Sequence, residues 1–191
     1  MKFIIEHLEP ELYKWCLIEY EHISKIVGKN KLIFTNIKKK YKNKLKKYGI
    51  VYGKRVVELK LKNICVLSQY CKKSLKTEDK NKFKYFVFGG ILGDNPAKKR
   101  TNSIVNNLKN NKIKFGIRNL GKKQMPTDTA VYVVKKILNG KKLNDFKFVD
   151  EVEIEVNENE SVVLPFTYVV DGNKLVINEK LVEHLRKRKE F

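Results

Sequence analysis

The chain has 191 residues, of which 42% are hydrophobic, and its formal net charge is +21. A chain of this length buries one substantial core, and its hydrophobic content excludes a disordered polypeptide. No apolar run approaches the roughly 20 residues of a membrane span, and the N-terminus lacks the long apolar segment and cleavage site of a signal peptide. We therefore expect a cytoplasmic protein with no membrane contact, built as an α/β domain.

The cysteines and histidines indicate neither a disulfide framework nor a metal site. The three cysteines are odd in number and lack a CxxC spacing, and the three histidines are dispersed. These residues are Cys16, Cys65, Cys71, His7, His22 and His184. We expect no bound metal.

The charged residues are unevenly distributed. Five of the 42 basic residues are Arg, and the chain is rich in Asn and Ile, a combination typical of A/T-biased codon usage that raises Lys content without selecting a partner. Residues 38–84, however, hold 17 basic and three acidic residues, a net charge of +14, whereas residues 150–160 hold six acidic residues and no basic one. Two interpretations stay open: a positive face that approaches RNA or a ribonucleoprotein, and a solvated Lys-rich surface.

The first part of the chain alternates strands with helices. Residues 2–6 predict a short apolar strand, and a helix is expected to begin at Pro10 because proline suits a first helical turn. Residues 32–35 predict a second strand. Residues 37–48 have apolar side chains on one helical face and Lys on the others, which predicts a basic amphipathic helix capped by Asn36.

The middle of the chain continues this alternation. Residues 64–67 and 85–88 predict buried strands, whereas residues 56–61 predict a connector or a short strand. A helix follows the second buried strand, with its cap and first-turn proline in the DNP sequence of residues 94–96. Residues 113–117 predict another strand.

The C-terminal part has a different pattern. Residues 126–139 predict a helix, but from residue 145 onward apolar and polar residues alternate, which predicts a hairpin-like addition. Asn178 is expected to cap a basic C-terminal helix. The order of elements indicates an α/β fold with a mainly parallel sheet and βαβ crossovers, extended by a C-terminal β-hairpin and helix.

Two segments repeat a strand-glycine-loop-helix arrangement, FKYFVFGGILG at 83–93 and IKFGIRNLGKKQMPTD at 113–128. Such units form small-molecule sites at strand ends in α/β proteins. The glycine spacing G-G-x-x-G excludes a dinucleotide fingerprint and a P-loop. The glycines allow close approach of a ligand to the backbone, or a sharp strand exit made for packing. Two interpretations also stay open for Thr127 and Asp128, as site residues or as plain helix caps.

Several segments resemble the Sfm1-like branch of the SPOUT methyltransferases. The similarity runs from Met1 to about Ile177 and is weakest over residues 38–82. The segments that carry it are FIIEHLEPELYKWCLIEY at 3–20, FVFGGILGDNP at 86–96, KKRT at 98–101, IRNLGKKQMPTDTAV at 117–131 and FVDEVEIEVNENESVVLPFTYVVD at 148–171.

The resemblance implies a fold and a cofactor. It implies a SPOUT-type sheet whose C-terminal portion is tied into a trefoil knot, which departs from the general avoidance of knots. Residues 1–145 would form the methyltransferase core with the knot loops, and residues 146–191 an extension packed on the same domain. S-adenosylmethionine would bind in the knot loops. By motif match its ligands are Gly89, Gly90, Ile91, Leu92, Gly93, Arg118, Asn119, Leu120, Gly121, Gln124, Met125, Thr127 and Thr129.

The resemblance also implies a reaction, monomethylation of an arginine in a ribosomal protein. An arginine acceptor needs a carboxylate that orients the guanidinium, and Glu6, Asp94 and Asp128 are the candidates at strand ends or in the knot loops. Methylation of tRNA or rRNA is the alternative, with RNA contact through residues 38–84. A non-catalytic RNA- or ribosome-binding protein is a third possibility. We expect a monomer rather than a dimer, because the C-terminal extension could cover the dimer surface usual in the family.

Overall fold

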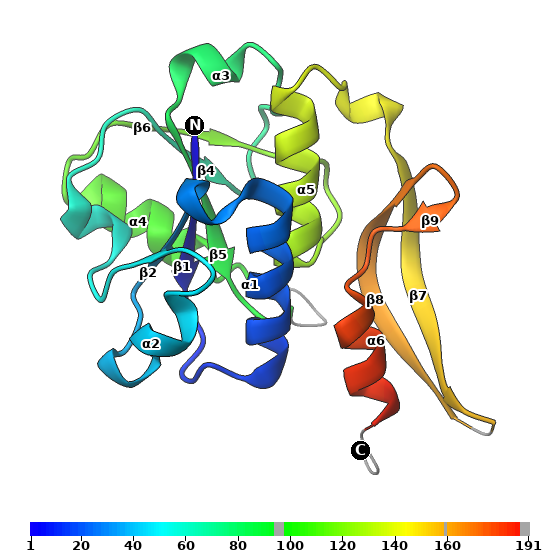
Figure 1. Cartoon of the computed structure of the whole chain (residues 1–191). Helices are drawn as coiled ribbons and strands as arrows, with labels where there is room; N and C mark the ends of the chain where they lie inside the picture. The colour runs from blue at the N-terminus through cyan, green and yellow to red at the C-terminus, as the bar shows by residue number, and fades with distance from the viewer. Residues whose placement is uncertain (94–97, 159, 188–191) are drawn as a thin grey trace.

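The computed structural model describes residues 1–93, 98–158 and 160–187. These residues contain a six-stranded sheet with the strand order β3-β2-β1-β5-β4-β6 and a three-stranded sheet with the order β7-β8-β9 (Figure 1). The strands of the first sheet are β1 (Lys2–His7), β2 (Leu32–Thr35), β3 (Ile50–Val51), β4 (Ile64–Leu67), β5 (Tyr85–Gly90) and β6 (Phe115–Arg118). All neighbouring strands in this sheet are parallel, as the sequence predicted.

Helices cover both faces of the parallel sheet. The α-helices are α1 (Lys14–Val27), α2 (Lys42–Leu45), α3 (Asp79–Lys82), α4 (Asn102–Asn110), α5 (Thr127–Leu138) and α6 (Glu179–Arg186). Short 3-10 turns are η1 (Lys29–Lys31), η2 (Lys39–Tyr41), η3 (Val56–Leu59) and η4 (Leu143–Asp145). None of the helices in the described ranges is long and apolar enough to cross a membrane.

Alternate residues of each strand pack against different helices on the two faces of the sheet. In β1, Phe3 and Ile5 pack into the core cluster that includes α1 and α5, whereas Ile4 packs into the cluster that includes α4. Successive strand residues point to opposite faces, so a continuous apolar run is expected where both faces are buried. The parallel sheet is therefore the middle layer of a three-layer structure.

The C-terminal segment packs against α1. It comprises β7 (Lys147–Asn157), β8 (Glu160–Asp171), β9 (Lys174–Leu175) and α6. Its core cluster includes Leu164, Tyr168 and Leu185 together with Ile18 of α1. Asn178 caps α6 as predicted, since its side chain accepts a hydrogen bond from the Lys180 amide, and its amide group also donates to the Ile18 carbonyl at 3.0 Å.

Two predicted helices differ from the structure. α1 begins at Lys14, so Pro10 lies before it and not in its first turn. Residues 37–48 do not form one helix but the 3-10 turn η2 and the single turn α2. The reason is a competing backbone pairing: the Asn36 amide donates to the Lys54 carbonyl, and the Ile37 amide donates to the Tyr52 carbonyl. Asn36 is not a cap; its φ is +60° and its side chain donates to the His7 carbonyl.

Three further expectations concern the middle of the chain. Residues 94–96, expected to cap and start a helix, lie outside the described residues, and α4 begins at Asn102. Residues 56–61, expected as a connector or short strand, contain the 3-10 turn η3. The strand expected at 113–117 is β6, which runs from Phe115 to Arg118.

The close packing around Gly90, at the end of β5, leads to a testable prediction. A Cβ atom on Gly90 would overlap the Tyr20 hydroxyl and lie 2.8 Å from Ile5 Cγ2. We expect Gly90→Ala to lower the free energy of unfolding by about 1–3 kcal/mol, the usual cost of overpacking a core. Urea unfolding measures this. Gly53→Ala is the matched control, because its Cβ would meet other atoms at 3.4 Å or beyond and should change stability little; equal losses in both variants would contradict the packing argument.

Candidate functional site

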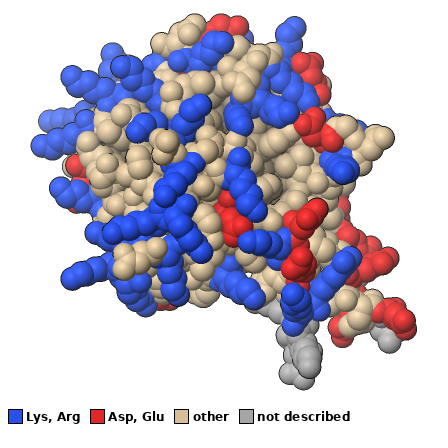
Figure 2. All heavy atoms as spheres, viewed as in Figure 1, with Lys and Arg blue, Asp and Glu red and all other residues tan. Residues whose placement is uncertain are grey.

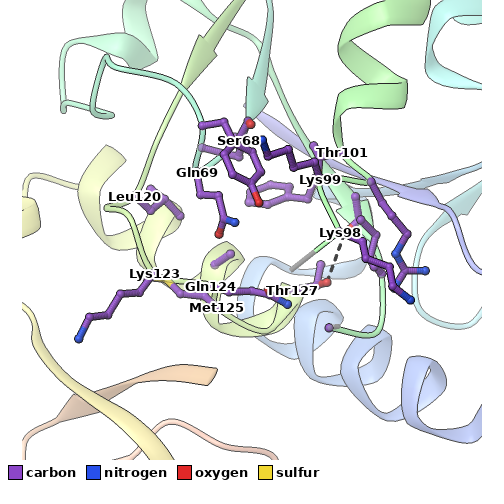
Figure 3. Close-up of a pocket in the computed structure, with 18 of the residues that line it drawn as sticks. Ser68, Gln69, Lys98, Lys99, Thr101, Leu120, Lys123, Gln124, Met125 and Thr127 are labelled. Atoms are coloured by element: carbon purple, nitrogen blue, oxygen red, sulfur yellow. Dashed lines mark hydrogen bonds between the residues drawn. The ribbon is translucent and has the colours of Figure 1, made fainter. Parts of the chain in front are cut away.

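A pocket opens where β4 and β5 end. It encloses about 860 Å³ of space, part of it open to solvent, and its lining comes from the ends of β4 and β5, residues 98–101, the loop after β6, and the start of α5 (Figure 3). The carboxyl ends of parallel strands meet at one edge of a sheet, which is where α/β proteins bind small molecules. The pocket lies at the strand edge that the sequence predicted.

Eight of the predicted cofactor ligands line this pocket. They come from both glycine loops and from the first turn of α5, and they are Gly89, Ile91, Gly93, Leu120, Gly121, Gln124, Met125 and Thr127. The pocket therefore joins the two strand-glycine-loop units that lie far apart in the sequence.

The pocket has an apolar wall and a glycine backbone. Leu120 and Met125 supply apolar surface from the loop after β6, and Phe88 supplies it from β5. A Cβ atom on Gly89 would lie 2.8 Å from Ile91 Cδ1 and 3.2 Å from the Thr101 hydroxyl oxygen. The absence of a side chain at Gly89 therefore lets Ile91 and Thr101 pack closely against the end of β5.

Thr127 ties the two glycine loops together. Its hydroxyl donates to the Gly89 carbonyl at 3.3 Å, so the first turn of α5 is linked to the end of β5 (Figure 3). The loop between β6 and α5 is also held by the C-terminal sheet, because the Thr167 amide of β8 donates to the Gln124 carbonyl at 2.8 Å. The pocket wall is thus attached both to the parallel sheet and to the C-terminal sheet.

Part of the lining was not anticipated from the sequence. Ser68, Gln69 and Tyr70 follow β4 and line the pocket, as do Lys98 and Lys99. The buried strand predicted at 64–67 is the sequence feature that could have indicated these residues. It is β4, which pairs with both β5 and β6, so the residues that follow it lie between the two glycine loops. The residues after this strand are polar and match no binding motif, so the sequence alone does not indicate that they belong to the site.

Arg118 and Asn119 do not line the pocket. The Arg118 guanidinium binds the Asp79 carboxylate through two hydrogen bonds, Nε to Oδ2 at 2.8 Å and Nη2 to Oδ1 at 2.7 Å. The Asn119 side chain accepts from the Ser74 hydroxyl and the Gly121 amide. These two residues hold the loop in place by structural contacts.

Gly90, Leu92 and Thr129 also lie apart from the lining. Gly90 packs against Tyr20, as described above. The Leu92 amide donates to Glu9 Oε1 at 2.7 Å. Thr129 is fully buried in α5. Motif match to the family suggested these residues as ligands, and the structure places each of them in these packing or hydrogen-bond contacts.

The structure describes two of the three candidate carboxylates, and both are buried. Glu6 is buried and accepts hydrogen bonds from the Val56 amide at 2.6 Å and the Thr35 hydroxyl at 3.3 Å; burial raises its pKa above the ordinary value. Asp128 is buried behind the pocket wall, where Oδ2 lies 2.7 Å from His22 Nδ1. Neither lines the pocket. Asp94 lies outside the described residues.

A buried acidic residue of α1 was missed. Glu19 is 5% exposed and accepts a hydrogen bond from Trp15 Nε1 at 3.0 Å. Burial, and then the nearby charge of Asp128, raise the pKa of Glu19 well above its ordinary value. The sequence feature that could have indicated its burial is its position, at helical spacing among the apolar residues of the first helix.

The described residues offer no evident metal centre. No group of three or more His, Cys, Asp or Glu side chains among them could hold a metal ion. The pocket instead presents apolar side chains, open backbone and cationic side chains. This composition suits an organic ligand that carries an anionic group.

The fold and the pocket define the class of protein. Solved structures with a similar fold include the dual-specific Trm10 of Thermococcus kodakaraensis, with a TM-score of 0.63 and 19% identity, covering 75% of this chain and 95% of that chain. The protein is an α/β protein with SPOUT-like structural neighbours and a small-molecule pocket at its strand ends.

The family follows from closer matches. Residues 2–190 match the family described as "Protein arginine N-methyltransferase SFM1-like". The chain is 34% identical over 205 residues to protein arginine N-methyltransferase SFM1 of Saccharomyces cerevisiae, covering 98% of this chain and 95% of that protein. The crystal structure of the yeast SFM1 complexed with SAM has a TM-score of 0.88 at 33% identity and covers 97% of this chain and 90% of that chain. The chain belongs to the SFM1-like protein arginine N-methyltransferase family.

The Arg118–Asp79 pair yields a prediction with a defined pH dependence. Burial raises the pKa of Asp79, but the hydrogen bonds from Arg118 and the Lys76 amide outweigh it and hold that pKa below the ordinary 3.8. A lowered pKa means that the pair stabilises the fold above pH 3.8 and that this stabilisation is lost as the pH falls through the folded-state value. Arg118→Ala should cost about 3 kcal/mol at pH 7.

The measurement is urea unfolding of both proteins at pH 7 and pH 2.5. The difference between wild type and Arg118→Ala should shrink at the lower pH, because Asp79 is then increasingly protonated in both. Asp79→Asn should show the same loss at pH 7. A difference that stays constant between the two pH values would show that the contact acts by packing rather than by charge.

Proposed function

We propose that the pocket binds S-adenosylmethionine and that the protein transfers its methyl group to an arginine of a ribosomal protein. The observation that carries this proposal is the joining of the two glycine loops, 89–93 and 120–125, into one pocket in a chain of the SFM1-like family. The yeast relative, at 33% identity, is described as a complex with SAM.

The pocket residues suit this methyl donor. Adenosine needs apolar walls and backbone hydrogen bonds, and Leu120, Met125 and Phe88 with the glycine backbone can supply both. The methionine part of the donor carries a carboxylate, and Lys98 and Lys99 bring cationic side chains to the same pocket (Figure 3).

Methyl transfer makes limited demands on the protein. The donor supplies an activated methyl group on a sulfonium, and the acceptor nitrogen attacks in line with the leaving sulfur. Positioning and exclusion of water therefore provide most of the acceleration. The tie from Thr127 to Gly89 and the attachment of Gln124 to β8 hold the pocket wall rigid for that purpose.

The charge distribution favours an acceptor that is a protein located on RNA. Figure 2 shows Lys and Arg side chains gathered over the side of α2 and α4, whereas acidic side chains gather over the β7–β8 hairpin. A groove beside the pocket is lined by Asp150 and Glu151 as well as Lys123 and Gln124. Asp150 is ion-paired with Lys123, and Glu151 brings a second carboxylate near the pocket mouth. Carboxylates attract a guanidinium, and residues 38–84 would approach ribosomal RNA through their excess of Lys.

Incubation with methyl-labelled S-adenosylmethionine and ribosomes tests the donor, the activity and the acceptor together. We expect label that survives RNase, is lost to protease and is recovered as monomethylarginine. Label lost to RNase would establish the RNA alternative, and absence of label would establish the non-catalytic one. Transfer should also fall as salt rises, since screening weakens the contact of residues 38–84 with RNA.

A matched pair of variants connects this assay to the pocket. Met125→Ala removes apolar surface from the lining and should weaken donor affinity about tenfold, or about 1.4 kcal/mol. Leu143→Ala, a truncation at a partly buried core residue outside the lining, should leave donor affinity unchanged. Calorimetry gives both values, and equal affinities would place the donor elsewhere.

We also propose that the chain from β6 through residues 119–126 into α5 forms the trefoil knot. Two contacts support it: Thr127 bonds the Gly89 carbonyl, and a Cβ atom on Gly93 would lie 2.7 Å from Gln124 Nε2, so the loop after β5 meets the segment that enters α5. Stretching the unfolded chain by its ends tests this. An unknotted chain reaches about 3.3–3.6 Å per residue, whereas a tightened knot stops measurably short of that length.

A further inference from the structure

The polar segment 68–74, which follows β4, contains one aromatic residue, Tyr70. Its side chain is 44% exposed and belongs to none of the three core clusters found among the described residues. It lines the pocket, as does Phe88, the other aromatic residue of the described lining, which is 3% exposed. Core packing therefore does not explain why the Tyr70 ring lies on the solvent side of the pocket.

Hydrogen bonds fix the backbone on both sides of Tyr70. The Ser68 amide donates to the Arg118 carbonyl at 2.9 Å, and the Cys71 amide donates to the Ser68 carbonyl at 3.2 Å, which closes a four-residue turn. The Asn119 side-chain amide donates to the Cys71 carbonyl at 2.6 Å. The turn is thus anchored to β6 and to the loop that follows it. A ring carried on such a turn is already positioned, so a ligand that binds it pays little for ordering the loop.

The Tyr70 ring already holds a cation. Lys99 Nζ lies 5.1 Å from the ring centroid, within the limit of about 6 Å for a cation–π contact. Both side chains line the pocket, but Tyr70 belongs to the turn after β4 and Lys99 to the segment before α4. Figure 3 labels Gln69 and Lys99, which mark these two segments. The contact therefore shows a place on the pocket lining where the protein stabilises a positive charge on an aromatic face.

We propose that the face of the Tyr70 ring binds the guanidinium of the acceptor arginine, in the place that Lys99 Nζ takes in this structure. This inference rests on the proposed function and names a residue that receives its substrate. The acceptor is a side chain of another protein, so it has to enter from solvent, and part of the Tyr70 ring is exposed to solvent. Tyr70 is thus an acceptor-binding residue that holds the guanidinium and takes no part in bond making.

Exchange of Lys99 for an arginine side chain is favourable for two reasons. A guanidinium is planar and delocalised, so it stacks on a ring face, whereas an ammonium is a compact charge that water hydrates strongly. Lys99 is exposed and was proposed above to bind the donor carboxylate, so it has a second place in the same pocket. Stacking also fixes the plane of the guanidinium, which limits the directions in which its nitrogens can approach the methyl group.

The donor has apolar surface of its own in the same pocket. Leu120 is 9% exposed and Phe88 is 3% exposed, and both line the pocket. A buried apolar wall suits the adenine ring of the donor, whereas the exposed Tyr70 ring with a cation on it suits a guanidinium. Donor and acceptor therefore each have a surface that fits their chemistry, on different parts of one lining.

The test compares Tyr70→Leu with Tyr70→Phe at saturating labelled donor and increasing concentrations of ribosomes. Leucine removes the ring face, so we expect the KM for ribosomes to rise about tenfold. Phenylalanine keeps the face, so its KM should stay within about twofold of wild type. Tyr13→Leu is the matched control, because Tyr13 is 45% exposed and lies outside the described lining; its KM should equal that of wild type. Urea unfolding checks that the variants are folded.

Two binding measurements identify what the ring holds. Calorimetry gives the affinity for the donor, and a loss of donor affinity in Tyr70→Leu that accounts for the change in KM would place the adenine on the ring and overturn the proposal. Filter binding gives the affinity for protein-free ribosomal RNA, and weaker binding by Tyr70→Leu would place a nucleobase there instead. A raised KM with both affinities unchanged assigns the ring to the acceptor arginine.

The proposed function and the acceptor site fail in different ways. Wild-type protein that forms no monomethylarginine would refute the proposed function. Wild-type protein that forms it, while Tyr70→Leu has the same KM for ribosomes or Tyr70→Phe loses as much as Tyr70→Leu, would refute the acceptor site alone.

Discussion

The site depends on the parallel register of the central strands. β5 pairs with β1 on one side and β4 on the other, and β4 pairs in turn with β6, so the exits of β4, β5 and β6 meet at one edge. Two glycine loops that are separate in the sequence become facing walls because of this register alone. Every other feature of the pocket, from the Thr127 bond to the apolar lining, refines a position that the hydrogen-bond ladder has already set.

The packing of α1 on α5 imposes a second condition. A carboxyl group buried between two helices is costly unless it is hydrogen-bonded or uncharged. Glu19 meets both conditions, through Trp15 and through its raised pKa, and Asp128 is held by His22 and by the backbone. Buried polar groups that are hydrogen-bonded in this way can rigidify a core, and these two lie on the helices that pack beside the pocket.

Much of the fold could be predicted from local patterns. The strands at 32–35 and 64–67 were predicted to the residue, because a short apolar run buried on both faces leaves little choice of ends. The prediction of a helix at 37–48 was wrong, since its Lys-rich periodicity competes with backbone pairing to residues 52–54 that no local pattern reveals. Tertiary pairing thus overrode a locally favourable helix.

The pocket was predictable in part for the same reason. Gly89 lies at the end of β5 and Leu120 just after β6, where the strand pattern predicts a site, whereas Thr127 begins α5 and was named by motif match to the family. Arg118 could not, because its partner Asp79 lies in a short helix whose position relative to β6 depends on the folded sheet. Glu19 likewise becomes notable only once α1 and α5 are adjacent.

The cap of the last helix links the two ends of the chain. Asn178 bonds the carbonyl of Ile18, and Leu185 of α6 shares a core cluster with Ile18. During synthesis, at about 5–20 residues per second, the outer face of α1 must therefore stay uncovered for several seconds after it emerges, until α6 has been made. The native core around Ile18 is therefore completed only after α6 has been synthesised.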